Sequence, residues 1–107
     1  MRKDIKMVKS ISPINKTLIN KLINTCKRYY PSMVMELVLD GKVIIKSSNR
    51  DAITSTIYND GDEFQLICYN DNMELGWFVL CPYERDINGV IADVAETDFS
   101  DKIFNEI

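Results

Sequence analysis

The sequence predicts an α+β domain in which a single antiparallel β-sheet of about five strands packs against two or three helices. Three patterns lead to this prediction: helical spacing of apolar residues near the N-terminus, short segments of alternating apolar and polar residues, and turn-forming residues between those segments. The expected order of elements is α-β-β-α-β-β-β-α. A chain of 107 residues that is 46% hydrophobic suffices for one core, so residues 1–107 are predicted to be a single domain.

The first predicted helix has the clearest start and end. Residues 1–11 lack a clear periodic pattern and are expected to form either a basic, loosely ordered lead-in or an edge strand. Ser12 can cap the free amides of a helix that begins at Pro13, and Pro31 ends that helix. Its core-facing stripe is predicted to consist of Ile14, Leu18, Ile19, Leu22, Ile23, Cys26, Tyr29 and Tyr30.

A hairpin and a short helix are predicted next. Residues 33–39 alternate in the manner of a strand, and Asp40-Gly41 is a two-residue turn signal before a second strand around residues 43–45. Residues 47–49 offer capping side chains for a helix over residues 50–58. This segment is therefore expected to supply a β-β-α unit.

The C-terminal half is predicted to contain a second hairpin, a short strand and a helix. Residues 64–69 and 75–83 are expected to form the hairpin, with residues 70–73 as its connection. Residues 90–94 are expected to form the fifth strand, and Thr97 to cap the last helix. The buried face of that helix is predicted to consist of Phe99, Ile103 and Ile107.

The sheet is predicted to be apolar on both faces. The segment 75–83 carries Trp77 on one side and Phe78 on the other, each with further apolar neighbours. Such a sheet has to cover its second face with helices or with a partner. Three helices are enough to cover both faces. If they do not, Trp77 or Phe78 with Tyr69 and Tyr83 would form an aromatic patch for a homodimer or a target protein.

The chain contains no histidine, which removes the usual basis of acid–base and nucleophilic catalysis and of many metal sites. It has no glycine-rich phosphate loop, and its carboxylates near residues 60–63 and 71–74 lack the spacing of a calcium-binding loop. Cys26, Cys68 and Cys81 are an odd set with apolar neighbours and are predicted to be buried free thiols in an intracellular protein. We therefore expect no enzymatic activity, no catalytic residue, no cofactor and no metal site.

Charge is divided unequally along the chain, although the net charge is only −3. Residues 1–30 carry eight basic side chains and one acidic, for a net charge of +7, whereas residues 31–107 carry five basic and fifteen acidic, for −10. The basic part predicts contacts with an anion such as a phosphate backbone, through Lys16, Lys21, Lys27 and Arg28. The acidic part predicts a surface for a protein partner, formed by Asp71, Glu74, Trp77, Glu84 and Asp86. Mutual neutralisation of the two parts within the fold is the alternative to both.

Leu75-Gly76-Trp77-Phe78 and Ile91-Ala92-Asp93 resemble segments of small orphan proteins of phages and mobile elements. The abundance of Ile, Asn and Lys, whose codons are AT-rich, also favours a low-GC bacterium or its phages. The expected function is non-enzymatic: binding and inhibition of a host protein such as a defence nuclease, in the manner of anti-CRISPR proteins. We expect the chain to act in the host cytoplasm without a membrane span. A homodimer is left open, and the alternative function is that of a nucleic-acid-binding accessory or regulatory protein that uses the basic N-terminal helix.

Overall fold

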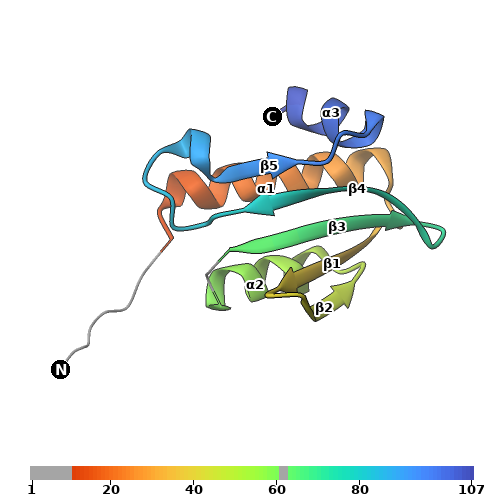
Figure 1. The fold of residues 1–107 in the computed structure, drawn as a ribbon, viewed down its shortest axis with the longest axis horizontal. Coiled ribbons are helices and arrows are strands. Elements are labelled where there is room, and N and C mark those ends of the chain that lie inside the picture. Colours follow the sequence, from red (N-terminus) through yellow and green to blue (C-terminus); the bar gives the residue numbers. More distant parts are fainter. Residues whose placement is uncertain (1–10, 61–62) are drawn as a thin grey trace.

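The computed structural model of the chain describes residues 11–60 and 63–107, so most of the predicted basic lead-in lies outside the described residues. Within them the predicted fold class is confirmed: three α-helices pack against one antiparallel five-stranded sheet, in the order α-β-β-α-β-β-β-α (Figure 1). The elements are α1 (Pro13–Tyr29), β1 (Val34–Leu39), β2 (Lys42–Ser47), α2 (Arg50–Asp60), β3 (Phe64–Asn70), β4 (Met73–Leu80), the short 3-10 helix η1 (Ile87–Gly89), β5 (Ile91–Val94) and α3 (Asp98–Asn105). The strands lie in the order β2-β1-β3-β4-β5, so β1 and β3 are neighbours although α2 separates them in sequence.

Side chains that were predicted as caps start the three helices. Ser12, Asn49 and Thr97 each accept a hydrogen bond from the backbone N–H three residues later, at 3.2, 3.0 and 3.1 Å. These bonds satisfy amides that have no partner inside the helix. The predicted starts of the three helices are therefore confirmed, and each helix has the capping hydrogen bond from which its start was predicted.

Both hairpins turn through two residues with positive φ. Asp40 and Gly41 have φ values of 51° and 79°, and Asp71 and Asn72 have φ values of 52° and 65°. Two successive residues in the left-handed region make the tight turn whose twist matches that of paired strands. The second hairpin was predicted with a four-residue connection, but its outer residues already belong to the strands, as Asn70 pairs with Met73.

The predicted strand over residues 75–83 is wrong at its C-terminal end. β4 ends at Leu80, because Pro82 has no N–H to donate to a sheet. The backbone N–H of Cys81 still donates to the carbonyl of Val90 at 2.7 Å, after which the chain leaves the sheet. β5 begins one residue later than predicted, at Ile91.

All three helices pack on the same face of the sheet. Leu37, Leu66 and Phe78 form one row across β1, β3 and β4, and all three are fully buried on this face. The helices contribute Ile19, Leu22, Ile23 and Cys26 from α1, Ile53 and Ile57 from α2, and Ile103 from α3. Of the two arrangements that the sequence allowed, the described chain has the one that leaves the opposite face of the sheet without a helix.

Both ends of α1 differ from the predicted apolar stripe. Ile14 is 65% exposed and Tyr29 is 38% exposed, whereas Asn15 is buried. The side-chain amide of Asn15 donates to the backbone carbonyls of Pro82 and Glu84, at 2.9 and 2.7 Å. The N-terminal end of α1 therefore packs against a loop whose carbonyls need donors, which favours an amide there over an isoleucine.

Two of the three thiols are placed as predicted. Cys26 on α1 and Cys68 on β3 are free and buried in the core. Cys81, just past the end of β4, is free but only partly buried, so the prediction of three buried thiols is wrong for this residue. Its position beside Pro82, where β4 leaves the sheet, accounts for the partial exposure.

Candidate protein-interaction face

We call the side of the sheet opposite the helices the open face. Its apolar and aromatic side chains are Val34 and Val38 on β1, Val43 on β2, Ile67 and Tyr69 on β3, and Trp77 and Val79 on β4. Each of them is partly exposed, in contrast to the fully buried rows on the helix side. The open face is thus an apolar strip that crosses four strands.

Trp77 lies on β4, the last of the four strands that this strip crosses. It is paired across the ladder with Ile67, and the neighbouring pair on the same strands is Gln65 with Val79. Phe78, the alternative to Trp77 in the predicted aromatic patch, points to the helix side and contacts the ring of Phe99 edge-on at 6.2 Å. Of the predicted aromatic patch, Trp77 and Tyr69 therefore share the open face, and Phe78 belongs to the core.

Carboxylates outnumber ammonium groups on and around the open face. Cross-strand pairing places Glu36, Glu74 and Asp93 on it, and two further acids line a pocket at its edge, Asp40 and Glu63. The ammonium that the register places on this face, among the residues described, is that of Lys46. The apolar strip therefore lies in a negative field.

One of these carboxylates is neutralised within the chain. Lys46 Nζ lies 3.9 Å from Glu36 Oε2 and 4.7 Å from the centre of the Tyr69 ring. The hydroxyl of Tyr69 donates to Glu36 Oε1 at 3.2 Å. Partial burial, the nearby Glu36 carboxylate and its hydrogen bond, and the charge of Glu74 together raise the pKa of the Tyr69 hydroxyl. This cluster is self-contained, because each charge or donor in it has a partner.

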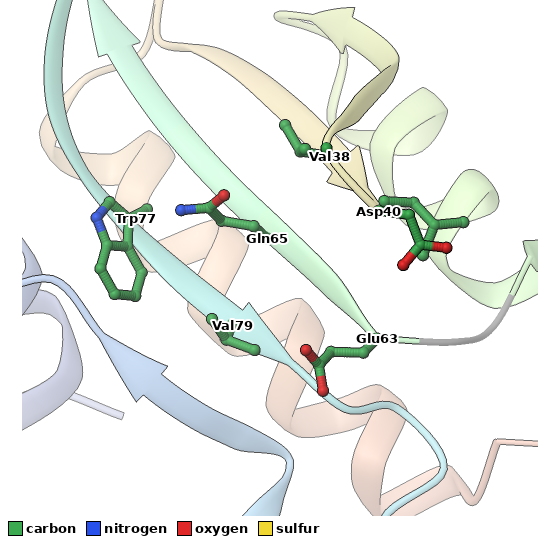
Figure 2. Close-up of a pocket in the computed structure, with 8 residues that line it drawn as sticks. Val38, Asp40, Glu63, Gln65, Trp77 and Val79 are labelled. Carbon is green, nitrogen blue, oxygen red and sulfur yellow. The ribbon is translucent and has the colours of Figure 1, made fainter.

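A pocket of about 630 Å³ opens at the end of the open face where β1 ends and β3 begins (Figure 2). Its floor is the cross-strand row of Val38, Gln65 and Val79, and Trp77 stands along one side. The side of the pocket away from Trp77 is formed by the Asp40–Gly41 turn, Leu39 and Glu63, with both carboxylates shown as sticks in Figure 2. The pocket thus combines an aromatic wall, a largely apolar floor and two acids.

Glu63 also contacts the partly buried thiol. Cys81 Sγ lies 3.7 Å from Glu63 Oε1, with the thiol as donor. Partial burial, the charge and hydrogen bond of Glu63, and the charge of Glu84 raise the pKa of the Cys81 thiol. The thiol is therefore held in its protonated, weakly nucleophilic form, which is the opposite of what a catalytic cysteine needs.

The structure brings together only part of the predicted acidic surface. Glu74 and Trp77 share the open face, and Asp71 lies in the turn beside them. Glu84 and Asp86 follow the other end of β4, which is about 27 Å long at the usual rise per residue. Asp86 caps η1 there, with its carboxylate accepting from the N–H of Asn88 at 2.9 Å.

The predicted basic surface is divided between two sides of α1. Lys16 lies over the ring of Tyr58, 5.3 Å from its centre, and Lys27 donates to the carbonyl of Ser48 at 2.8 Å. Lys21 borders a small apolar hollow near the C-terminus. Arg28 forms an ion pair with Glu106 at 2.8 Å. Lys27 and Arg28 are therefore bound to polar groups of the chain itself, and Lys16 contacts an aromatic ring.

The polar residues of this site that were not among the predicted site residues are Glu36, Asp40, Lys46, Glu63, Gln65 and Asp93. The alternation of β3 predicts that Gln65, Ile67 and Tyr69 share a face, and this signal is present in the sequence. Asp40 and Glu63 line one pocket because β1 pairs with β3, and no local pattern in the sequence specifies that pairing.

The described residues contain no group of three cysteine or carboxylate side chains that could hold a metal ion. No helix among them is long and apolar enough to cross a bilayer. No family model, curated protein or solved structure matches this chain. A proposal for the function of this chain therefore rests on the geometry of the open face.

Proposed function

We propose that this chain is a non-enzymatic protein that binds a partner protein through its open face. The observation that carries the proposal is the packing of all three helices on one side of the sheet, which leaves Trp77 and its apolar neighbours partly exposed on the other. Exposed apolar sheet surface of this kind is usually covered by a partner. Tryptophan is also among the residues that contribute most to protein interfaces.

The charge of the open face supports a basic partner. Asp40, Glu63, Glu74 and Asp93 have no cation within ion-pair distance among the described residues. A surface with basic residues around an apolar patch would complement them. Enzymes that bind nucleic acids present such basic surfaces to the phosphate backbone. We therefore propose a nucleic-acid-binding enzyme of the host, such as a defence nuclease, as the partner, and inhibition by occupation of its substrate site.

The resemblance to phage and mobile-element proteins supports an inhibitor of this kind that acts in the cytoplasm of a bacterial host. A second copy of the chain complements the open face less well, because pairing two such faces would bring carboxylates against carboxylates. Nucleic acid is disfavoured on the open face for the same reason. The competing proposal, a nucleic-acid-binding protein, would have to use the cations of α1, of which Lys27 and Arg28 are engaged within the chain.

An affinity capture with matched variants tests the proposal. The tagged chain is used as bait in a low-GC bacterial lysate, with and without nuclease treatment, beside Trp77→Ser and Phe104→Ser. Phe104 is a suitable control because it is 44% exposed and lies on α3, in the helix layer. Circular dichroism checks that each variant folds.

We expect a stoichiometric protein that survives nuclease treatment, is lost with Trp77→Ser and is retained with Phe104→Ser. The captured protein should lose its nucleic-acid binding when the chain is added. Recovery of nucleic acid, with proteins that disappear after nuclease treatment, would contradict the proposal. In that case Lys16→Ala with Lys21→Ala should abolish recovery, and binding should weaken steeply with salt.

A further inference from the structure

We infer that the pocket at the edge of the open face receives an arginine side chain of the partner, with its guanidinium between the carboxylates of Asp40 and Glu63. This inference rests on the proposed function, because it names what the partner contributes to the open face. It commits to a basic protein segment as the occupant. The argument for that occupant is charge complementarity together with the shape of the pocket.

The dimensions and the floor of the pocket suit a long side chain with an apolar stem. Its volume of about 630 Å³ is ample for one such side chain and the backbone that carries it. Val38, Gln65 and Val79 form the floor in one row across β1, β3 and β4. The methylene stem of an arginine packs well on a floor of this kind. Trp77 bounds the row on one side and provides a flat apolar wall for the entering segment (Figure 2).

No lysine or arginine is among the described residues that line the pocket. Val38 pairs with Gln65 in antiparallel register. Asp40 comes two residues after Val38 and Glu63 comes two residues before Gln65, so both lie toward the same end of the sheet. Both carboxylates line the same pocket, where like charges repel, and no cation of the described residues lies within ion-pair distance of either one. A cation from outside the chain would relieve this repulsion.

Guanidinium fits the two acids better than an ammonium does. It presents five N–H donors in one plane, so one group can donate to two carboxylates at once, whereas an ammonium is a compact point charge. Glu63 accepts a hydrogen bond from the thiol of Cys81, and a carboxylate has acceptor sites left after one weak bond. We therefore expect the pocket to prefer arginine to lysine and to reject citrulline, which has the same shape without the charge.

The test is a nuclear magnetic resonance titration of the ¹⁵N-labelled full chain with N-acetyl-arginine methylamide. Trp77 is the one tryptophan of the sequence, so its indole N–H gives an unambiguous signal at the pocket wall. The lysine and citrulline analogues serve as ligand controls. Asp40→Asn with Glu63→Gln removes both charges, and asparagine tolerates the positive φ of Asp40. Glu96→Gln removes one charge at an exposed site outside the pocket and serves as the control variant.

We expect the arginine compound to shift the indole and Gln65 amide signals saturably, the lysine compound to bind more weakly, and the citrulline compound to have no effect. The Asp40→Asn, Glu63→Gln variant should weaken arginine binding by about tenfold or more, and Glu96→Gln should leave it unchanged. Equal binding of arginine and citrulline, or full binding by the double variant, would overturn the inference. If arginine does not bind but Trp77→Ser still abolishes capture, the pocket assignment falls and the proposed function stands. If arginine binds and Trp77→Ser captures the same protein as the unmodified chain, the proposed function falls.

Discussion

Gly76→Ala probes the close packing of α3 on β4, which is what keeps this helix on the covered side of the sheet. A Cβ atom at position 76 would overlap the hydroxyl oxygen of Ser100 and would lie 2.7 Å from Thr97 Oγ1. Ser100 is fully buried, so its side chain has no room to turn away. Thr97 is the cap of α3, so a shift of its hydroxyl also weakens the start of the helix.

The expected cost follows from these two effects. Overpacking by one methyl group at a rigid site costs about 1–3 kcal/mol, and loss of the cap adds about 1 kcal/mol. Together they lower the free energy of unfolding by about 2–4 kcal/mol. For a domain of this size that corresponds to a fall in Tm of about 8–16 °C. Thermal and urea unfolding followed by circular dichroism measure both quantities.

Two further variants separate this mechanism from a general effect of replacing glycine. A Cβ atom at Gly89 would lie 2.5 Å from Cγ of Glu84, but Glu84 is exposed and flexible, so Gly89→Ala should cost less than about 1 kcal/mol. Ser100→Ala removes the oxygen that position 76 would overlap, so the double variant should recover about 1 kcal/mol or more. Equal losses for Gly76→Ala and Gly89→Ala, or no recovery in the double variant, would refute the close packing of α3.

Three other predictions concern stability. Asn15→Ala should cost about 1–3 kcal/mol in urea unfolding, because two loop carbonyls lose the donor that reaches them at 2.9 and 2.7 Å; an unchanged midpoint would contradict this. A hydrogen bond with Cys26 and burial hold the pKa of the Cys68 thiol in the folded chain well above its usual value. The protonated thiol therefore contributes fully to the free energy of unfolding below about pH 8.5, and this contribution is lost at higher pH because the thiol of the unfolded chain ionises first. The free energy of unfolding should therefore fall with pH above that point, by up to about 1.4 kcal/mol per pH unit for this group, and Cys68→Ala should flatten the slope. Phe78→Ala should cost about 3–5 kcal/mol and Val79→Ala about 1 kcal/mol or less, because these neighbours face opposite sides of the sheet; similar losses would argue that both faces are covered.

Local interactions explain why much of the fold was predictable. Ser12, Asn49 and Thr97 cap helices through bonds that span three residues, and Asp40-Gly41 forms a turn whose conformation depends on those two residues. Each of these features is complete within a few positions of sequence. Their residue types therefore carry enough information to locate the elements.

Features that depend on distant segments were not predictable in the same way. Asn15 is buried because the loop after β4 brings two carbonyls over α1, and nothing in the helical pattern indicates that loop. The pocket exists because β1 pairs with β3 in a register that places Asp40 near Glu63. Alternation specifies the face of each residue within a strand, whereas the choice and register of neighbouring strands arise from the packing of the whole sheet.

The most direct test of the open face is the affinity of the captured partner for Trp77→Ser and Phe104→Ser, measured by calorimetry against the unmodified chain. A tryptophan that is a hot spot of an interface contributes about 2 kcal/mol or more, so Trp77→Ser should raise Kd by about 30-fold or more. Phe104→Ser, on the helix layer, should leave Kd nearly unchanged. A loss of affinity with Phe104→Ser, or an unchanged Kd with Trp77→Ser, would contradict the account and place the interaction on the helix side of the molecule.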